Sequence, residues 1–164
     1  MVDGIYVLNE TKFGVWLNKE EYPEAKIPYK AHQTDAGFDL FAVFKKDDPQ
    51  GSLVIGPLHR EIIHTGVHIN LLDGWEAQIR PRSGLAAKKG ITVLNTPGTI
   101  DSSYSGEIMV ILQNNSQDVF TVNPGDKIAQ MVIKRVPSVG LYGLNEKPTN
   151  EDRGDSGFGS TGEK

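Results

Sequence analysis

The sequence predicts an all-β protein, a jelly-roll-like sandwich or barrel of many short strands with one short helix. Two observations support this fold class. Apolar residues occur either in alternation with polar ones or in short β-branched runs, which are the two patterns of strands. Turn-forming residues separate these segments regularly, without the long helical segments of an alternating α/β fold.

Four segments have the strand pattern. Apolar and polar residues alternate over residues 67–69 and 75–80, which predicts strands with one buried face. Residues 108–112 and 128–133 are apolar runs, which predict strands buried on both faces. The longest uninterrupted run is far shorter than the ~20 residues of a membrane-spanning helix, so we expect no membrane association.

Turn signals fall between these segments. Pro97 followed by Gly98 is the residue order of a type II turn, and it predicts a hairpin. Residues 123–126 predict a second tight turn, which leads into the run 128–133. Further turn signals lie at residue 9 and at residues 47–51, 56–57, 72–74 and 114–115.

One short helix is expected at residues 85–89. Ser83 precedes it as the expected N-cap, and Gly90 follows as the stop. Lys88 and Lys89 would lie in its last turn, where positive charge interacts favourably with the helix dipole.

The composition is that of an intracellular globular protein. The 164 residues fit one domain, and 38% hydrophobic residues with 23% charged residues exclude wholesale disorder. The absence of cysteine excludes disulfides, thiolate nucleophiles and cysteine-based metal sites. Residues 1–4 lack the pattern of a secretion signal, so we expect a cytoplasmic location. A net charge of −4 argues against direct nucleic-acid binding.

Three conspicuous patterns have plainer explanations. Residues 157–162 match the G-x-G-x-x-G fingerprint of dinucleotide binding, but too few residues follow to form its helix. Residues 153–155 spell a cell-adhesion tripeptide, which we interpret as coincidence. His59, His64 and His68 could form a metal site, with His64 and His68 on one face of a strand; solvated histidines are the commoner case.

Chemically useful side chains gather at a few places. Residues 80–84 combine two arginines, a serine and a glycine, which suit phosphate binding or, equally, a capped surface helix. Asn95 stands in the predicted hairpin, where its amide and free backbone groups could recognise a nucleobase. Asp101 and Tyr104 follow. Asp101 is a candidate general base and the Tyr104 ring a flat surface against which a ligand could pack; alternatively, they are a turn-forming carboxylate and a half-buried tyrosine. Asp39 is a carboxylate flanked by apolar residues.

These segments resemble, in order, the five motifs of the homotrimeric dUTPase family. The matching segments are residues 36–40, 81–84, 98–108, 125–130 and 153–162. The resemblance runs from about residue 22 to residue 162, and five motifs in the right order are a specific signal. Ser156 departs from the pattern, because a glycine is usual there.

The resemblance implies a β jelly roll that assembles as a homotrimer with active sites at subunit boundaries. It implies hydrolysis of dUTP to dUMP and pyrophosphate with Mg²⁺ on the triphosphate, which limits uracil incorporation into DNA and supplies dUMP for dTTP synthesis. Asp101 would activate the water that attacks the α-phosphorus, Tyr104 would pack on the deoxyribose, and Asp39 would meet the metal through water.

The other implied contacts involve the base and the phosphates. The uracil site would comprise Asn95, Gly98, Thr99, Ile100 and Met109. The phosphates would be held by Arg82, Ser83, Gly84 and Gln130.

The resemblance also divides the chain. Residues 22–145 would form the β domain, and the glycine-rich residues 146–164 an arm that closes an active site, usually of another subunit. The arm residues implied in substrate binding are Arg153, Phe158, Gly159, Ser160 and Thr161. Residues 1–21 would be an extension packed on the same domain, a possible surface for a protein partner. An added strand pair there is suggested by Tyr6, Val7, Phe13, Val15 and Trp16.

Two other functions remain open at this point. A dCTP deaminase shares the fold and several phosphate contacts, although the uracil-type hairpin and the glycine arm disfavour it. Alternatively, dUTP binding switches the shape of the protein for a protein partner, a role that could coexist with catalysis.

Overall fold

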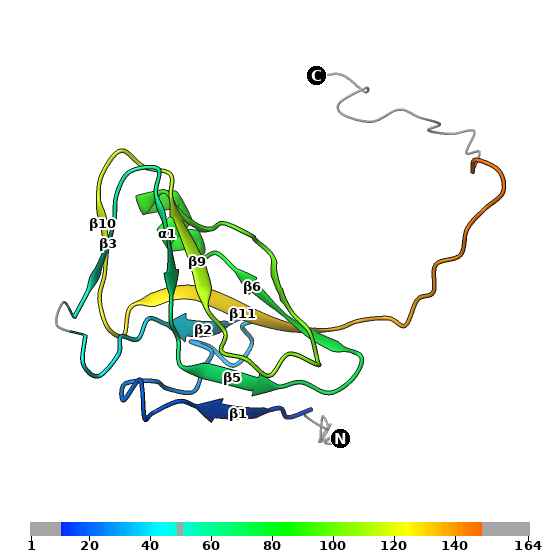
Figure 1. The fold of residues 1–164 in the computed structure, drawn as a ribbon, viewed down its shortest axis with the longest axis horizontal. Coiled ribbons are helices and arrows are strands. Elements are labelled where there is room, and N and C mark those ends of the chain that lie inside the picture. Colours follow the sequence, from blue (N-terminus) through cyan, green and yellow to red (C-terminus); the bar gives the residue numbers. More distant parts are fainter. Residues whose placement is uncertain (1–10, 49–50, 149–164) are drawn as a thin grey trace, which may run out of the picture.

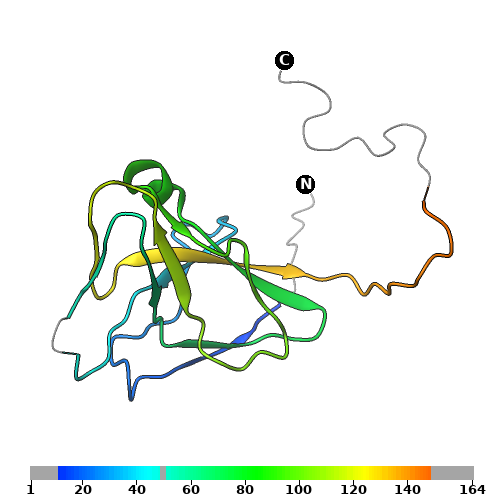
Figure 2. The same ribbon diagram turned by 45° about the horizontal axis from the view of Figure 1, so that its top comes forward.

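The computed structural model describes residues 11–48 and 51–148. Figures 1 and 2 show a β domain with one short helix, α1 (Ser83–Lys89). Residues 136–148 leave the domain after the last strand and run outward as an extended segment. The fold is all-β and of the jelly-roll type, as predicted. The strands are β1 (Gly14–Leu17), β2 (Phe38–Phe41), β3 (Leu53–Ile55), β4 (Arg60–Ile63), β5 (Val67–Asn70), β6 (Trp75–Arg80), β7 (Ile91–Val93), β8 (Gly98–Ile100), β9 (Val110–Asn114), β10 (Phe120–Val122) and β11 (Lys127–Arg135).

All strand pairings are antiparallel. The larger sheets have the orders β2-β11-β6-β8 and β4-β9-β7, and β1 pairs with β5 and β10 with β3. Buried apolar side chains from both larger sheets and both pairs form one hydrophobic cluster. Each fully buried Leu or Ile side chain in it stabilises the fold by about 1.5–3 kcal/mol.

The strand predictions are mostly confirmed. The alternating segments form β5 and β6, with the apolar positions of β6 facing the core. In β11 the neighbours Ala129 and Ile128 are both buried, as are Met131 and Val132, so this strand is covered on both faces. The same prediction for residues 108–112 is wrong, because Met109 is 43% exposed.

Two local predictions are wrong in detail. Ser83 is the first residue of α1 and not its N-cap; the extended Arg82 is the N-cap, and no side chain caps the helix. Gly90 ends α1 in the left-handed conformation with φ 67°, as predicted. Residues 97 and 98 do not form a type II turn, since the Thr96–Pro97 bond is cis and Gly98 begins β8 opposite Ile79 instead of adopting a positive φ.

The N-terminal segment contributes β1, whose residues Gly14 to Leu17 pair with Asn70 to Val67 of β5. Phe13, Val15 and Leu17 pack against the core. The predicted strand pair is not tested, because Tyr6 and Val7 lie outside the described residues. In the part of the chain that the structure describes, no helix has the length and hydrophobicity to cross a membrane.

Candidate active site

The segments 36–40, 81–84 and 125–130 meet in one cleft, as expected of segments that act together. The central strand β11 explains this, since its Gln130 lies opposite Asp39 of β2 and opposite Arg80 of β6. The cleft has a volume of about 300 Å³. It is lined by Ala31, Asp35, Ala36, Gly37, Asp39, Arg82, Ser83, Gly84 and Gln130.

Asp39 lies between two cations. Its carboxylate is 3.2 Å from Arg82 Nε and 2.7 Å from Lys127 Nζ, and its side chain is only 13% exposed. The hydrogen bond from Lys127 to Asp39 raises the pKa of Lys127 above its usual value. Arg82 also donates from Nη1 to the Lys127 carbonyl at 3.2 Å. Sequence reasoning missed Lys127, although it lies within the matching segment 125–130.

Gln130 is fixed by contacts on two sides. Its Nε2 donates to the Pro81 carbonyl at 2.9 Å. A Cβ atom at Gly37 would overlap with Gln130 Oε1 and lie 3.2 Å from Gln130 Cβ, so a larger residue at position 37 would displace the Gln130 side chain. At Gly84 an added Cβ would point into open space, which keeps this side of the cleft accessible.

The predicted hairpin is wrong, because β7 pairs with β9 and β8 pairs with β6, so the two strands belong to different sheets. The segment expected to recognise a base is therefore the β7–β8 connection, residues 94–97. Asn95 is exposed in the connection, with its amide nitrogen 3.1 Å from the position of a Cβ on Gly98. Thr99 is exposed on β8, opposite Gln78, and Ile100 is opposite Ala77. The β7–β8 connection therefore presents an amide beside β8, the edge strand of its sheet, which is a suitable arrangement for a planar ligand with donors and acceptors.

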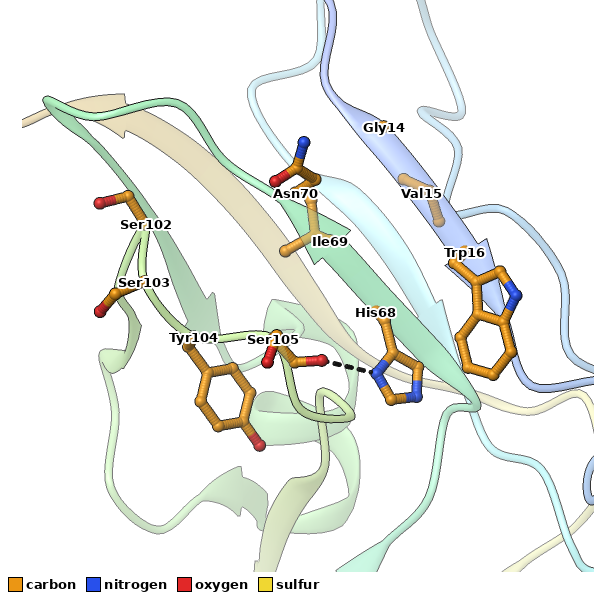
Figure 3. A pocket seen from close by; sticks show the side chains of 10 residues that line it. All are labelled: Gly14, Val15, Trp16, His68, Ile69, Asn70, Ser102, Ser103, Tyr104 and Ser105. Atoms are coloured by element: carbon orange, nitrogen blue, oxygen red, sulfur yellow. Dashed lines mark hydrogen bonds between the residues drawn. The ribbon is translucent and has the colours of Figure 1, made fainter.

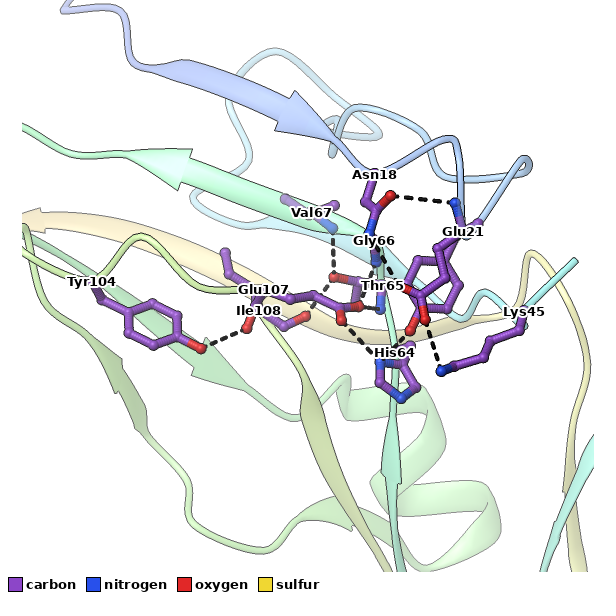
Figure 4. A network of polar contacts seen from close by, with 11 residues as sticks. Asn18, Glu21, Lys45, His64, Thr65, Gly66, Val67, Tyr104, Glu107 and Ile108 are labelled. Carbon is purple, nitrogen blue, oxygen red and sulfur yellow. Dashed lines mark hydrogen bonds and ion pairs between the residues drawn. The ribbon is translucent and has the colours of Figure 1, made fainter.

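Asp101 directly follows β8 and begins a tight loop. Its side chain is exposed, and its carbonyl accepts a hydrogen bond from Tyr104 N at 3.1 Å. Tyr104 is 40% exposed, and its hydroxyl donates to the Glu107 carbonyl at 2.8 Å (Figure 4). The loop therefore presents a carboxylate beside an aromatic ring, and Met109 follows with its side chain partly exposed.

Asp101 and Arg82 are not brought together within one chain. Ile100, the residue before Asp101, lies opposite Ala77 near the start of β6. Arg82 follows the end of β6, five residues beyond Ala77, and five residues of strand span roughly 15 Å. Asp101 instead follows Ile100 toward the opposite end of β6. The cleft and the Asp101 loop are therefore separate surfaces of this chain.

The remaining candidates are placed as follows. Arg153, Phe158, Gly159, Ser160 and Thr161 lie outside the described residues. His64 and His68 do not share a strand face, because β4 ends at Ile63 and Gly66 turns the chain with φ 66° before β5. They bind protein acceptors, with His64 on Glu107 and His68 on the Ser105 carbonyl.

The cleft fits a metal ion that arrives with its ligand better than a resident ion. The described residues contain no group of three His, Cys, Asp or Glu side chains able to hold a metal. Mg²⁺ usually keeps several waters and is held by one or two carboxylates together with substrate phosphates. Asp39, with Asp35 in the same cleft, matches that requirement, and Arg82 and Lys127 match the phosphate charge.

Known proteins similar to this chain agree with the site. A family model described as dUTPase matches residues 23–162. The deoxyuridine 5'-triphosphate nucleotidohydrolase of Clostridium novyi (strain NT) is 52% identical over 139 residues, which are 85% of this chain and 92% of that protein. That of Clostridium tetani (strain Massachusetts / E88) is 49% identical over 155 residues, 94% of this chain and 99% of that protein.

Solved structures show the same fold. A dUTPase of Staphylococcus bacteriophage 80alpha with dUpNHpp superposes with a TM-score of 0.78 at 24% identity, over 93% of this chain and 99% of that one. A mutant dUTPase from phage phi11 of S. aureus, described with a coordinated structural Mg(II) ion, superposes with a TM-score of 0.71 at 24% identity, over 85% and 100% of the chains. With this fold, the match over residues 23–162 and relatives about half identical, the chain belongs to the dUTPase family.

Proposed function

We propose that this protein hydrolyses dUTP to dUMP and pyrophosphate. The observation that carries the proposal is the family match over residues 23–162, which includes the Asp101 loop and the Asp39 cleft. The relatives named deoxyuridine 5'-triphosphate nucleotidohydrolases support the same substrate. The activity would limit uracil incorporation into DNA and supply dUMP for dTTP synthesis, and a cytoplasmic location stays a prediction.

Asp101 is the proposed general base. Its carboxylate is exposed and has no hydrogen-bond partner among the described residues, so it is available to a water molecule. Asp101 accepts a proton as the water oxygen attacks the α-phosphorus. The bond from that phosphorus to the oxygen bridging to the β-phosphorus breaks, and pyrophosphate leaves with the electron pair. The new oxygen stays on dUMP.

Selectivity for the nucleoside is assigned to the β7–β8 connection and the Asp101 loop. The Asn95 amide and the backbone of Gly98, Thr99 and Ile100 would pair with uracil, with no room near Met109 for the methyl group of thymine. The exposed Tyr104 ring would pack on the deoxyribose and exclude a 2′-hydroxyl group. The fixed hydroxyl of Tyr104 supports this role, since a rigid wall discriminates better than a mobile one.

The cleft is assigned to the triphosphate. Arg82, Ser83, Gly84 and Gln130 would bind its oxygens, and the Arg82 guanidinium can contact two of them at once. Asp39 would hold Mg²⁺ through water, and the bound ion neutralises negative charge on the phosphates. Arg153, Phe158, Gly159, Ser160 and Thr161 of the arm would close over the substrate.

We propose further that the complete site forms between copies in a homotrimer. The separation of Asp101 from Arg82 supports this, because one chain alone supplies the base and the phosphate cleft on different surfaces. Residues 136–148 support it as well, since they leave the domain with apolar side chains such as Leu141 fully exposed.

The proposal is tested by measuring pyrophosphate release from dUTP, dTTP, dCTP and UTP with Mg²⁺. Wild-type protein should hydrolyse dUTP preferentially. Asp101→Asn should lower kcat by ~10²–10⁴ and preserve dUTP binding, since only the general base is lost. Asp73→Asn, a change at another exposed carboxylate, is the matched control.

Each other outcome has a definite meaning. An unchanged kcat for Asp101→Asn would contradict the mechanism. Ammonia release from dCTP would identify a deaminase. Binding of dUTP without hydrolysis would favour the nucleotide-dependent switch, and a pull-down with and without dUTP would then search for the protein partner.

A further inference from the structure

Two histidines link the segment 14–22, which contains β1, to the loop at residues 101–107. The His64 ring stacks on Tyr22 with centroids 5.1 Å apart, and the His68 ring meets Trp16 edge-on at 4.8 Å. Neither histidine takes part in the proposed reaction. Each has its other contact on the loop.

His64 holds the end of the loop through Glu107. Its Nδ1 lies 2.9 Å from Glu107 Oε2, and because a carboxylate can only accept, Nδ1 carries the hydrogen and donates it. Oε1 of the same carboxylate accepts from the backbone N–H groups of Thr65 at 3.0 Å and Gly66 at 2.8 Å. The Glu107 side chain is only 15% exposed, so these three hydrogen bonds are largely shielded from solvent and fix Glu107 to residues 64–66 (Figure 4).

His68 holds the middle of the loop. Its Nδ1 donates to the Ser105 carbonyl at 3.0 Å, as Figure 3 shows. A groove of about 710 Å³ separates the rest of the loop from β1 and β5, with Trp16 on one side and Ser102 and Ser103 on the other. His68 therefore bridges the groove and connects the sheet to the loop.

The His64–Glu107 and His68–Ser105 hydrogen bonds, which we call the two anchors, both hold residues next to Tyr104 or bonded to it. The Glu107 carbonyl accepts the Tyr104 hydroxyl at 2.8 Å, and Ser105 is the next residue in the chain. The ring lies against Gly106, where an added Cβ would come within 2.5 Å of Tyr104 Oη and 2.6 Å of Cζ. Since the ring packs this closely on the loop backbone, a shift of either anchor displaces the ring.

We propose that His64 and His68 are positioning residues that fix the Tyr104 ring and thereby set the discrimination between deoxyribose and ribose. The inference rests on the proposed function, in which Tyr104 packs on the sugar. Base recognition is assigned to the β7–β8 connection around Asn95, whereas the bonds of His64 and His68 to the loop go to Glu107 and Ser105. Loss of both anchors should therefore affect sugar selection and leave base selection unchanged.

The test compares kcat/KM for dUTP, UTP and dTTP in the full-length wild type and the double variant His64→Ala, His68→Ala. The dUTP-to-UTP ratio should fall about tenfold, the effect of losing two hydrogen bonds that position one ring. The dUTP-to-dTTP ratio should stay unchanged. Such ratios do not depend on the fraction of active enzyme, so a merely unstable variant would change neither.

Conservative and distant changes complete the design. His64→Asn with His68→Asn keeps an N–H donor attached to Cγ, where Nδ1 was, and should restore most of the sugar selectivity. His59→Ala, which removes an Nδ1 bond to the Pro57 carbonyl on another loop, is the matched control. If the double alanine variant does not fold, the partly exposed His68→Ala single variant replaces it.

The inference is overturned if the double alanine variant keeps both the dUTP-to-UTP and the dUTP-to-dTTP ratio at the wild-type values, or if both ratios fall together. It is also overturned if the asparagine variant has a dUTP-to-UTP ratio no higher than that of the alanine variant. Wild-type protein that does not hydrolyse dUTP would instead contradict the proposed function itself. The two failures are therefore distinguishable.

Discussion

At the scale of single residues, Asp39 shows how one carboxylate organises the cleft. Its ion pairs with Arg82 and Lys127 orient two cations toward the same space. On binding a triphosphate with its Mg²⁺, these cations can exchange one anionic partner for another. The charge of the proposed triphosphate would therefore meet groups that are already in place, which would reduce the cost of ordering them.

A pH prediction follows for Tyr22, whose hydroxyl lies 2.9 Å from His64 Nδ1. Burial, with the negative charges of Glu107 and Glu21, raises the pKa of Tyr22 to about 12. In the unfolded chain it is about 10. Below about pH 10 the Tyr22 phenol is neutral in both the folded and the unfolded state. Between about pH 10 and about pH 12 it is ionised only in the unfolded state, so the free energy of unfolding should fall as pH rises.

The check is the free energy of urea unfolding measured across this alkaline range. Tyr22→Phe should show a shallower decline than wild type, while Tyr142→Phe, a change at an exposed tyrosine, should follow the wild type. Equal slopes for wild type and Tyr22→Phe would contradict the prediction.

At the scale of elements, the sequence predicts what depends on local patterns and misses what depends on pairing. Alternation predicted β5 and β6, because burial of one strand face is a property of the strand's own residues. The ion pair of Lys127 with Asp39 needs β2 beside β11, which residue patterns do not state. The placement of His64 and His68 was wrong because Gly66 turns the chain between them.

The same division applies to the candidate site. The five motifs include most residues of the cleft and the loop, because motifs and their order can be recognised directly in the sequence. The separation of Asp101 from Arg82 and the two histidine anchors arise from the register of β6 with β8 and the contacts of the N-terminal segment, and these are tertiary features.

Helix α1 gives a paired prediction. Gly90→Ala should lower the free energy of unfolding by about 1 kcal/mol or more, because Gly90 has φ 67° and a Cβ there would lie 3.3 Å from Ser116. Gly84→Ala should raise it by up to about 1 kcal/mol, since Ala is the better helix former and its Cβ meets open space.

Urea unfolding curves measure both effects. Because Gly84 lines the cleft assigned to the triphosphate, Gly84→Ala should also weaken dUTP binding although it stabilises the fold. A destabilised Gly84→Ala, or a Gly90→Ala as stable as wild type, would contradict the helix geometry described here.

At the scale of the whole molecule, the proposed site is divided over separate surfaces of one chain. The Asp101 loop and the Asp39 cleft lie on different parts of the domain, and residues 136–148 leave it as an extended segment (Figures 1 and 2). A homotrimer would bring each part next to a complementary part of a neighbour, which is the general advantage of repeating one surface by symmetry.

Mixing two inactive variants tests this arrangement. Asp101→Asn and Arg82→Ala should each be nearly inactive, but co-refolding them in equal amounts should restore activity at about a quarter of the sites, those that draw both intact residues from different chains. Pyrophosphate release is the measurement, and mixing without refolding is the control. No recovery after refolding would place Asp101 and Arg82 of each site on the same chain.

The edge-on contact of Trp16 with His68 has a practical consequence. The chain contains only two tryptophans, and the other, Trp75, packs against Phe13 and Arg135. In a Trp75→Phe protein all indole emission would come from Trp16, on the wall of the groove that faces Tyr104. The molecule thus contains its own optical probe of the Tyr104 loop, and nucleotide titrations can follow that loop by fluorescence without an attached dye.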